Sequence, residues 1–262
     1  MRLISLAKIV ICLLVVLFSL SSCKNKEAGR RSIVCLVDFS DSKDATERLQ
    51  FYMTAIKDNI MPKLSYTDKI TVIPIDKASI TNASDILLAD LATHDFEPES
   101  ASPMEEEQIT KENLKKYTDS LAAAFAQTFQ SAIQGRNKTS HGTDIFGALE
   151  VAKGKMAAND NNVIILLSDM MNYSNILKME PGNAEFNSKS IGDILNKVPS
   201  PHLPNTTVLV LTADQSYISQ EHFKLVQSFW AQYFEKNGIK LYDYNSASLS
   251  KLNELVSAVP DK

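Results

Sequence analysis

Side chains that carry hard oxygen donors stand at three separate places along this chain. They are, in chain order, Asp38, Ser40, Ser42, Thr143 and Asp169. Carboxylate and hydroxyl oxygens suit a divalent cation such as Mg²⁺, which takes six oxygen ligands and usually keeps several waters. Because the hydroxyl groups are neutral, a bound ion would keep part of its positive charge and attract a further carboxylate. This donor set predicts a recognition site that needs no general base.

The elements around these residues are expected to bring them together. Residues 33–38 and 163–168 are apolar runs of the kind found in parallel strands that are covered on both faces. Helices are expected at 43–60 and 144–158, directly after the first motif and the threonine segment. In a doubly wound sheet the ligand crevice lies at the carboxyl ends of the strands. If the two strands are neighbours there, all three segments converge.

The rest of the chain alternates strands with amphipathic helices, which predicts an α/β fold: a doubly wound, mostly parallel central sheet with helices on both faces. Further strands are expected at 69–73, 207–211 and 239–244, and further helices at 112–134, 188–198, 219–236 and 249–259. Pro74 predicts an interruption of strand pairing. Residues 77–110 are left open: 86–88 fit a short strand or a helical turn, and 98–107 favour an exposed loop.

Together these residues resemble the metal-ion-dependent adhesion site (MIDAS) of von Willebrand factor A (VWA) domains. The resemblance covers roughly residues 31–258, with Asp38, Ser40 and Ser42 in the first motif, Thr143 as the central threonine and Asp169 as the later aspartate. It implies direct ligation by the serines and, with ligand bound, by the threonine, while the aspartates often act through water. It also implies a coordination shift coupled to the last helix.

One ion, Mg²⁺ or alternatively Mn²⁺ or Ca²⁺, is expected. Integrin β subunits carry extra acidic residues for an adjacent ion, and Ala45 and Thr46 occupy those offsets here. The family often has glycine after the last aspartate, whereas this chain has Met170 and Met171. These two methionines are read either as adaptable contacts for a partner or as residues folded onto the core.

His141 and Asp144 complete a candidate ligand rim with Met170 and Met171, although His141 is also read as a loop residue without a role. Simpler roles exist for the motif residues. Asp41 or Ser42 could simply cap the helix expected from residue 43, Thr143 is also a good helix N-cap, and Asp169 suits a solvated turn. The three-part match at a strand–helix, a loop–helix and a strand–loop junction favours the metal site over these alternatives.

The first 22 residues are expected to be a lipoprotein signal peptide. Arg2 and Lys8 precede the apolar run 9–20, which is short for a membrane span, and residues 20–23 read Leu-Ser-Ser-Cys. This pattern looks like a bacterial lipobox with Cys23 as the lipidated residue; an uncleaved membrane anchor is the alternative. Residues 23–30 would form a tether and 31–262 the domain. Lys24 favours the outer membrane over the inner one, because it is not the aspartate that retains enterobacterial lipoproteins.

Composition narrows the function classes. The formal net charge of −4 and the absence of a basic stripe argue against nucleic acid as a partner. No zinc spacing, nucleophile elbow, phosphate loop or dinucleotide fingerprint is present. We therefore predict that the protein is a membrane-anchored, non-enzymatic module that binds a carboxylate of a protein partner through its metal ion. The alternatives are an enzyme that uses the ion as a Lewis acid and a structural envelope protein in which the metal only stabilises the fold.

Overall fold

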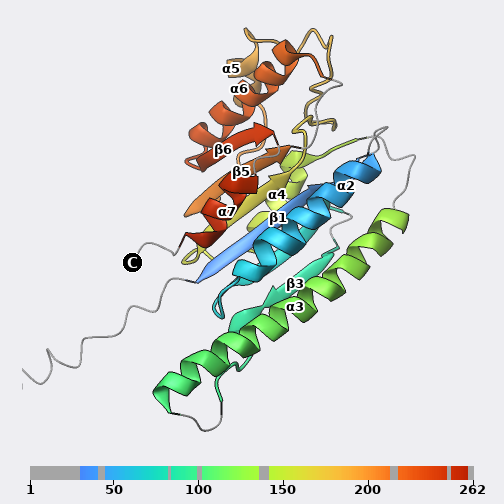
Figure 1. The fold of residues 1–262 in the computed structure, drawn as a ribbon. Coiled ribbons are helices and arrows are strands. Elements are labelled where there is room, and N and C mark those ends of the chain that lie inside the picture. Colours follow the sequence, from blue (N-terminus) through green and yellow to red (C-terminus); the bar gives the residue numbers. More distant parts are fainter. Residues whose placement is uncertain are drawn as a thin grey trace, which may run out of the picture. The chain divides into compact units, whose positions relative to one another are not determined.

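Strands from the whole length of the described chain form one sheet, in the order β3-β2-β1-β4-β5-β6 (Figure 1). The computed structural model describes residues 30–40, 45–81, 84–98, 102–135, 142–212, 218–246 and 249–258. The strands are β1 (Arg31–Asp38), β2 (Lys69–Ile75), β3 (Leu87–Asp90), β4 (Asn161–Leu167), β5 (Thr206–Thr212) and β6 (Lys240–Ser246). All neighbouring pairs are parallel except β2 and β3.

Helices cover both faces of this sheet. Their bounds are α2 (Ala45–Thr54) with its continuation η1 (Ala55–Ile60) and η2 (Met61–Lys63), η3 (Leu91–Thr93), α3 (Pro103–Gly135), α4 (Ile145–Lys153), α5 (Ile191–Leu195), α6 (Gln220–Lys236) and α7 (Leu249–Ser257). The apolar side chains of α4, α5 and α6 share one core with one face of the sheet, and those of α2, η1, α3 and α7 share a second core with the other face. The predicted three-layer α/β fold is therefore confirmed.

The central strand β1 shows why two cores form. Every residue of β1 is buried. Successive side chains of a strand point to opposite faces, so Val34 and Leu36 pack with α4 and α6, whereas Cys35 and Val37 pack with α2 and α3. Cys35 has no exposed surface and forms no disulfide, as expected for a small buried hydrophobe.

Pro74 does not interrupt strand pairing, contrary to the sequence prediction. β2 continues through Pro74 to Ile75, and Pro74 stands opposite Val37 of β1. The other neighbour of β2 is β3, whose pairing reaches only as far as Val72. Proline has no backbone N–H to donate. It is tolerated here because β3 does not extend alongside Pro74, so no hydrogen bond to β3 is required at this position.

The segment left open in the sequence contains a strand and the start of the longest helix. Residues 87–90 form β3, so the strand alternative is the right one. The expected loop at 98–107 is wrong in its second half, because α3 begins at Pro103. Pro103 suits a first helical position, and the Glu105 carboxylate accepts hydrogen bonds from the backbone N–H and hydroxyl of Ser102 at 3.2 and 2.6 Å. This return contact is half of a capping box.

All described residues belong to one compact unit, Arg30–Val259, which holds both cores. A chain that begins at residue 24 therefore keeps all the helices and strands that the structure describes. The signal peptide and Cys23 lie outside the described residues. Among the helices that are described, none is both long enough and apolar enough to cross a membrane.

Candidate metal centre

Asp38 and Ser168 connect the ends of the two central strands. β1 and β4 are parallel neighbours in register, with Val37 opposite Leu167. Just beyond this pair, the Ser168 hydroxyl donates to Oδ2 of Asp38 at 2.8 Å. Oδ1 of Asp38 accepts the backbone N–H of Ser40, also at 2.8 Å. The first motif and the segment that ends in Asp169 thus meet at the carboxyl edge of the sheet.

The Thr143 segment is held at this same edge by backbone hydrogen bonds. Thr143 and Tyr173 form an antiparallel bridge, with N···O distances of 3.1 and 2.8 Å. The N–H of Asp144 donates to the carbonyl of Asp76, directly after β2, at 2.8 Å. Gly142 has a φ of +148°, and a Cβ there would lie 3.0 Å from the carbonyl oxygen of Tyr173. The loop therefore requires glycine immediately before Thr143.

Asp144, rather than Thr143, caps the helix that follows. The Asp144 carboxylate accepts the backbone N–H of Gly147 at 3.0 Å as the N-cap of α4. The capping alternative for Thr143 is therefore wrong, and the Thr143 side chain is buried at the edge of the sheet.

Burial raises the pKa of Asp144; the hydrogen bond from Gly147 opposes this shift and the negative charge of Asp76 adds to it. Asp144 also lines a shallow cavity of about 260 Å³ beside Ile80 and Ile176, so it remains a candidate rim residue.

Asp169 is half-buried and begins a tight turn. Its Oδ1 accepts the N–H of Met171 at 2.8 Å. The next residue, Met170, has a φ of +65°, in the left-handed region that favours glycine. Many members of the family that the sequence resembles have glycine at this position, and Met170 takes a backbone conformation that glycine adopts without strain.

Met170 is not a contact for a partner. Its side chain is fully buried in the core that includes α6, and its carbonyl accepts the indole N–H of Trp230 at 2.8 Å. Of the two readings of the methionine pair, packing onto the core is therefore correct for Met170. Met171 is half-buried against the same core. The reason is the aromatic cluster of α6, which offers an apolar environment directly behind the turn.

Three residues around the centre escaped the sequence analysis. Arg48 of α2 donates to the Ser40 carbonyl at 2.8 Å. Asn172 is buried and accepts the N–H of Ile145, which places the start of α4. Ser168 holds Asp38. In the sequence, Arg48 could be recognised only as a basic residue on the apolar stripe of its helix. Neither Asn172 nor Ser168 belongs to a local sequence pattern that marks it as functional.

The donors that are described fit a divalent cation. Asp38 has no exposed surface, and its carboxylate has no ion pair with any described residue. A buried carboxylate without a positive partner is costly, so a cation at this edge would offset that cost. Ser42 and His141 lie outside the described residues. Within the described ones, no group of three or more His, Cys, Asp or Glu side chains is placed to hold a metal; the predicted set relies on hydroxyls and contains two carboxylates.

No protein-family model and no curated protein matches this chain. Among solved structures, the chain is similar to a von Willebrand factor type A protein from Catenulispora acidiphila, with 12% identity, 87% of this chain and 41% of that chain covered, and a TM-score of 0.41. It is also similar to BatB, a conserved hypothetical protein from Bacteroides thetaiotaomicron, with 15% identity, 87% and 96% covered, and a TM-score of 0.42. A third is an aerotolerance-related membrane protein from Bacteroides fragilis, with 13% identity, 88% and 96% covered, and a TM-score of 0.43. At these values the likeness concerns the fold alone.

Proposed function

We propose that this protein is an envelope-anchored, VWA-like module that binds one divalent cation at the carboxyl edge of β1 and β4. Through that ion it would recognise a carboxylate on a protein partner. The observation that carries the proposal is the fully buried carboxylate of Asp38, which accepts hydrogen bonds from the Ser168 hydroxyl and the Ser40 backbone where the first motif meets the segment that ends in Asp169.

The residues of the chain would divide the work. Ser40, Ser42 and Thr143 would offer neutral oxygens to the ion, and Asp38 and Asp169 would act through water. The ion, with part of its charge left uncompensated, would supply the attraction for the partner's carboxylate. Arg48 fixes the loop of the first motif through the Ser40 carbonyl, and Asp144 fixes the start of α4.

The anchoring part of the proposal rests on the N-terminal sequence. A basic start, a short apolar run and Leu-Ser-Ser-Cys at residues 20–23 support lipidation of Cys23. The residues that follow would tether the domain to an envelope membrane, with the outer membrane favoured. Metabolic labelling with a fatty acid tests this: wild-type protein should take up the label and Cys23→Ala should not.

Metal binding is tested by thermal unfolding of residues 24–262 in EDTA and then in millimolar Mg²⁺, Mn²⁺ or Ca²⁺. Ion at about 100 times its dissociation constant stabilises by about 2.7 kcal/mol, which corresponds to a rise in Tm of roughly 5–10 °C for a domain of this size. Asp38→Ala should abolish the rise. Asp85→Asn, a carboxylate paired with Lys155, is the matched control and should keep it. Absence of a rise with all three ions contradicts the metal centre.

Partner recognition is tested by affinity capture from a cell-envelope extract in Mg²⁺ and in EDTA. Capture of a protein that requires Mg²⁺ and is lost in Thr143→Val supports the proposal; Thr128→Val, on the exposed side of α3, is the control. Metal-dependent turnover of a phosphoester would instead support an enzyme. A metal-dependent rise in Tm without any metal-dependent capture would support a purely structural role.

A further inference from the structure

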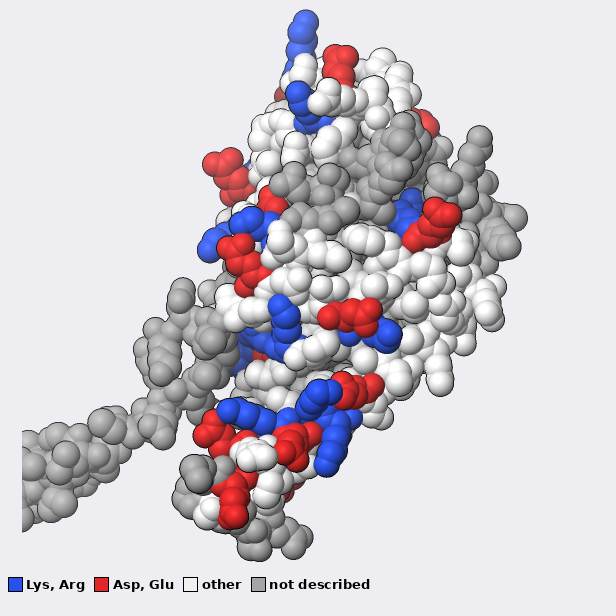
Figure 2. Space-filling model, viewed as in Figure 1, with Lys and Arg blue, Asp and Glu red and all other residues white. Residues whose placement is uncertain are grey.

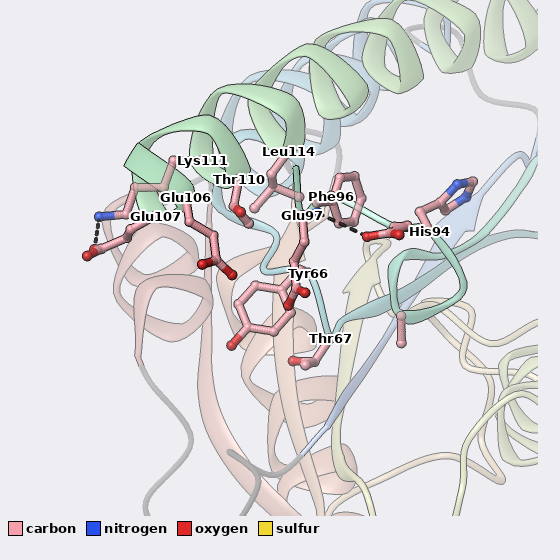
Figure 3. A pocket seen from close by; sticks show the side chains of 12 residues that line it. Tyr66, Thr67, His94, Phe96, Glu97, Glu106, Glu107, Thr110, Lys111 and Leu114 are labelled. Atoms are coloured by element: carbon pink, nitrogen blue, oxygen red, sulfur yellow. Dashed lines mark hydrogen bonds and ion pairs between the residues drawn. The ribbon is translucent and has the colours of Figure 1, made fainter. Parts of the chain in front are cut away.

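A second candidate binding site lies at the opposite edge of the sheet. A cavity of about 690 Å³ opens between the turn before β2, the segment after η3 and the first turns of α3 (Figure 3). Leu91, at the start of η3, donates its N–H to the carbonyl of Asp68, which directly precedes β2. The cavity is therefore near the amino end of β2. Asp38 is at the carboxyl end of the parallel strand β1, so the two sites are separate.

The lining of this cavity carries excess negative charge. Four carboxylates line it, those of Asp95, Glu97, Glu106 and Glu107, against the single ammonium group of Lys111. Lys111 pairs with Glu107 at 2.6 Å, and this contact lowers the pKa of Glu107. Glu97 and Glu106 have no ion pair with any described residue. Figure 2 shows acidic side chains intermixed with basic ones at the lower end of the molecule, where α3 begins.

An aromatic ring and an apolar floor accompany these carboxylates. Tyr66 is 56% exposed, although its ring is large and mostly apolar. In Figure 3 the carboxylates of Glu97 and Glu106 point into the cavity on either side of the Tyr66 ring, and Leu114 lies above them. Phe96, which is buried, adds a second apolar wall.

A cation on an apolar stem matches this combination. Carboxylates form strong charge-assisted hydrogen bonds with ammonium or guanidinium groups, an aromatic face attracts the same cations, and the methylene stem of lysine or arginine packs on apolar surface. The volume is in the range of pockets that hold organic ligands. A bare inorganic ion would leave the apolar walls without a contact.

We propose that this cavity binds a lysine or arginine side chain from a basic segment of a partner polypeptide. The charged end is held by Glu97 and Glu106 against the ring of Tyr66, and the stem packs on Leu114 and Phe96. This site is independent of the metal centre and works in the presence of EDTA.

The test is a titration of residues 24–262 with the acetylated, amidated peptide Gly-Lys-Lys-Gly, in EDTA at low ionic strength, followed by NMR of the isotope-labelled protein. Backbone signals of residues 66, 97 and 114 are expected to shift. Glu97→Gln combined with Glu106→Gln should raise the dissociation constant about tenfold, since two carboxylate contacts are lost. Tyr66→Ala should raise it about two- to fivefold. Glu150→Gln on α4 is the matched control and should bind as wild type does.

Three outcomes overturn the proposal. A peptide in which norleucine replaces both lysines has the same stem without the charge, and equal binding of this peptide shows that the cation is not recognised. Binding of spermidine or Ca²⁺ at these residues without binding of the lysine peptide shows a site for free cations. Unchanged affinity in the double glutamine variant shows that the carboxylates do not act. All substituted side chains are exposed or half-buried, so the Tm of each variant should stay near that of wild type.

Discussion

The hydroxyl group of Ser168 donates a hydrogen bond to Oδ2 of Asp38 across 2.8 Å and accepts one from the backbone N–H of Met170 at 2.9 Å. One buried side chain thus joins the end of β1 to the turn that contains Asp169. The Ser168 hydroxyl therefore helps to hold both the Asp38 carboxylate and the left-handed backbone at Met170 in place. The position of the candidate metal centre therefore rests on a serine outside the predicted ligand set.

Ser168→Ala should lower the free energy of unfolding by about 2 kcal/mol. The substitution leaves a buried carboxylate oxygen without its donor and the Met170 N–H without its acceptor, and hydrogen bonds to charged groups contribute roughly 1.5–3 kcal/mol. Guanidinium unfolding in EDTA measures the change. Ser131→Ala, at an exposed position of α3, should differ from wild type by no more than about 0.5 kcal/mol. Equal stability of both variants would contradict the role assigned to Ser168.

Gly147→Ala should destabilise the protein, although alanine is the better helix former. A Cβ at Gly147 would lie 2.2 Å from Oδ2 of Asp144, so the carboxylate must turn away and give up its cap contact. Loss of an N-cap costs about 1 kcal/mol, and the buried carboxylate must also find a new place. We expect a net loss of about 1 kcal/mol in chemical denaturation.

The control for this prediction is Gly192→Ala in α5, where a Cβ meets nothing within 4 Å. That substitution should leave stability unchanged or raise it by roughly 0.5 kcal/mol. A Gly147→Ala protein as stable as wild type would show that Asp144 does not hold the start of α4.

Substitutions of Met170 should rank glycine above alanine. Both lose the buried thioether side chain, which costs roughly 2–5 kcal/mol, but glycine relieves the φ of +65°. Left-handed backbone costs a residue with a Cβ about 1–2 kcal/mol, so Met170→Gly should be the more stable by about 1 kcal/mol. Met179 is the control, because it is equally buried and is not among the positive-φ residues. At that position Met179→Ala should be more stable than Met179→Gly by roughly 0.5–1 kcal/mol. The same order at both methionines would contradict the strain argument.

Cys35 should resist alkylation until the protein unfolds. Burial raises the pKa of its thiol far above the ordinary range, and only the thiolate reacts. In residues 24–262 it is the only cysteine, so mass spectrometry after iodoacetamide treatment at pH 8 reports on it alone. Folded protein should remain unmodified, and protein in guanidinium should take up one equivalent. Rapid modification under folding conditions would mean that the core around β1 opens readily.

The periodicity of the sequence determined the three-layer α/β fold. Apolar runs marked β1 and β4 because a strand covered on both faces has no polar side. The order of strands and helices then placed the polar residues after those strands at the carboxyl edge. These features are local, since they depend on residue type and short-range spacing, and Asp38 and Thr143 could be singled out from them.

Only the tertiary structure decided how these segments contact one another. β2 extends through Pro74 because β3 stops earlier, Met170 turns inward because α6 presents Trp230 behind it, and Ser168 matters because β1 lies beside β4. The acidic cavity is made by Tyr66, Glu97 and Glu106, which belong to three segments. Each of these facts depends on contacts between residues far apart in the chain, and such contacts leave no periodic signal in the sequence.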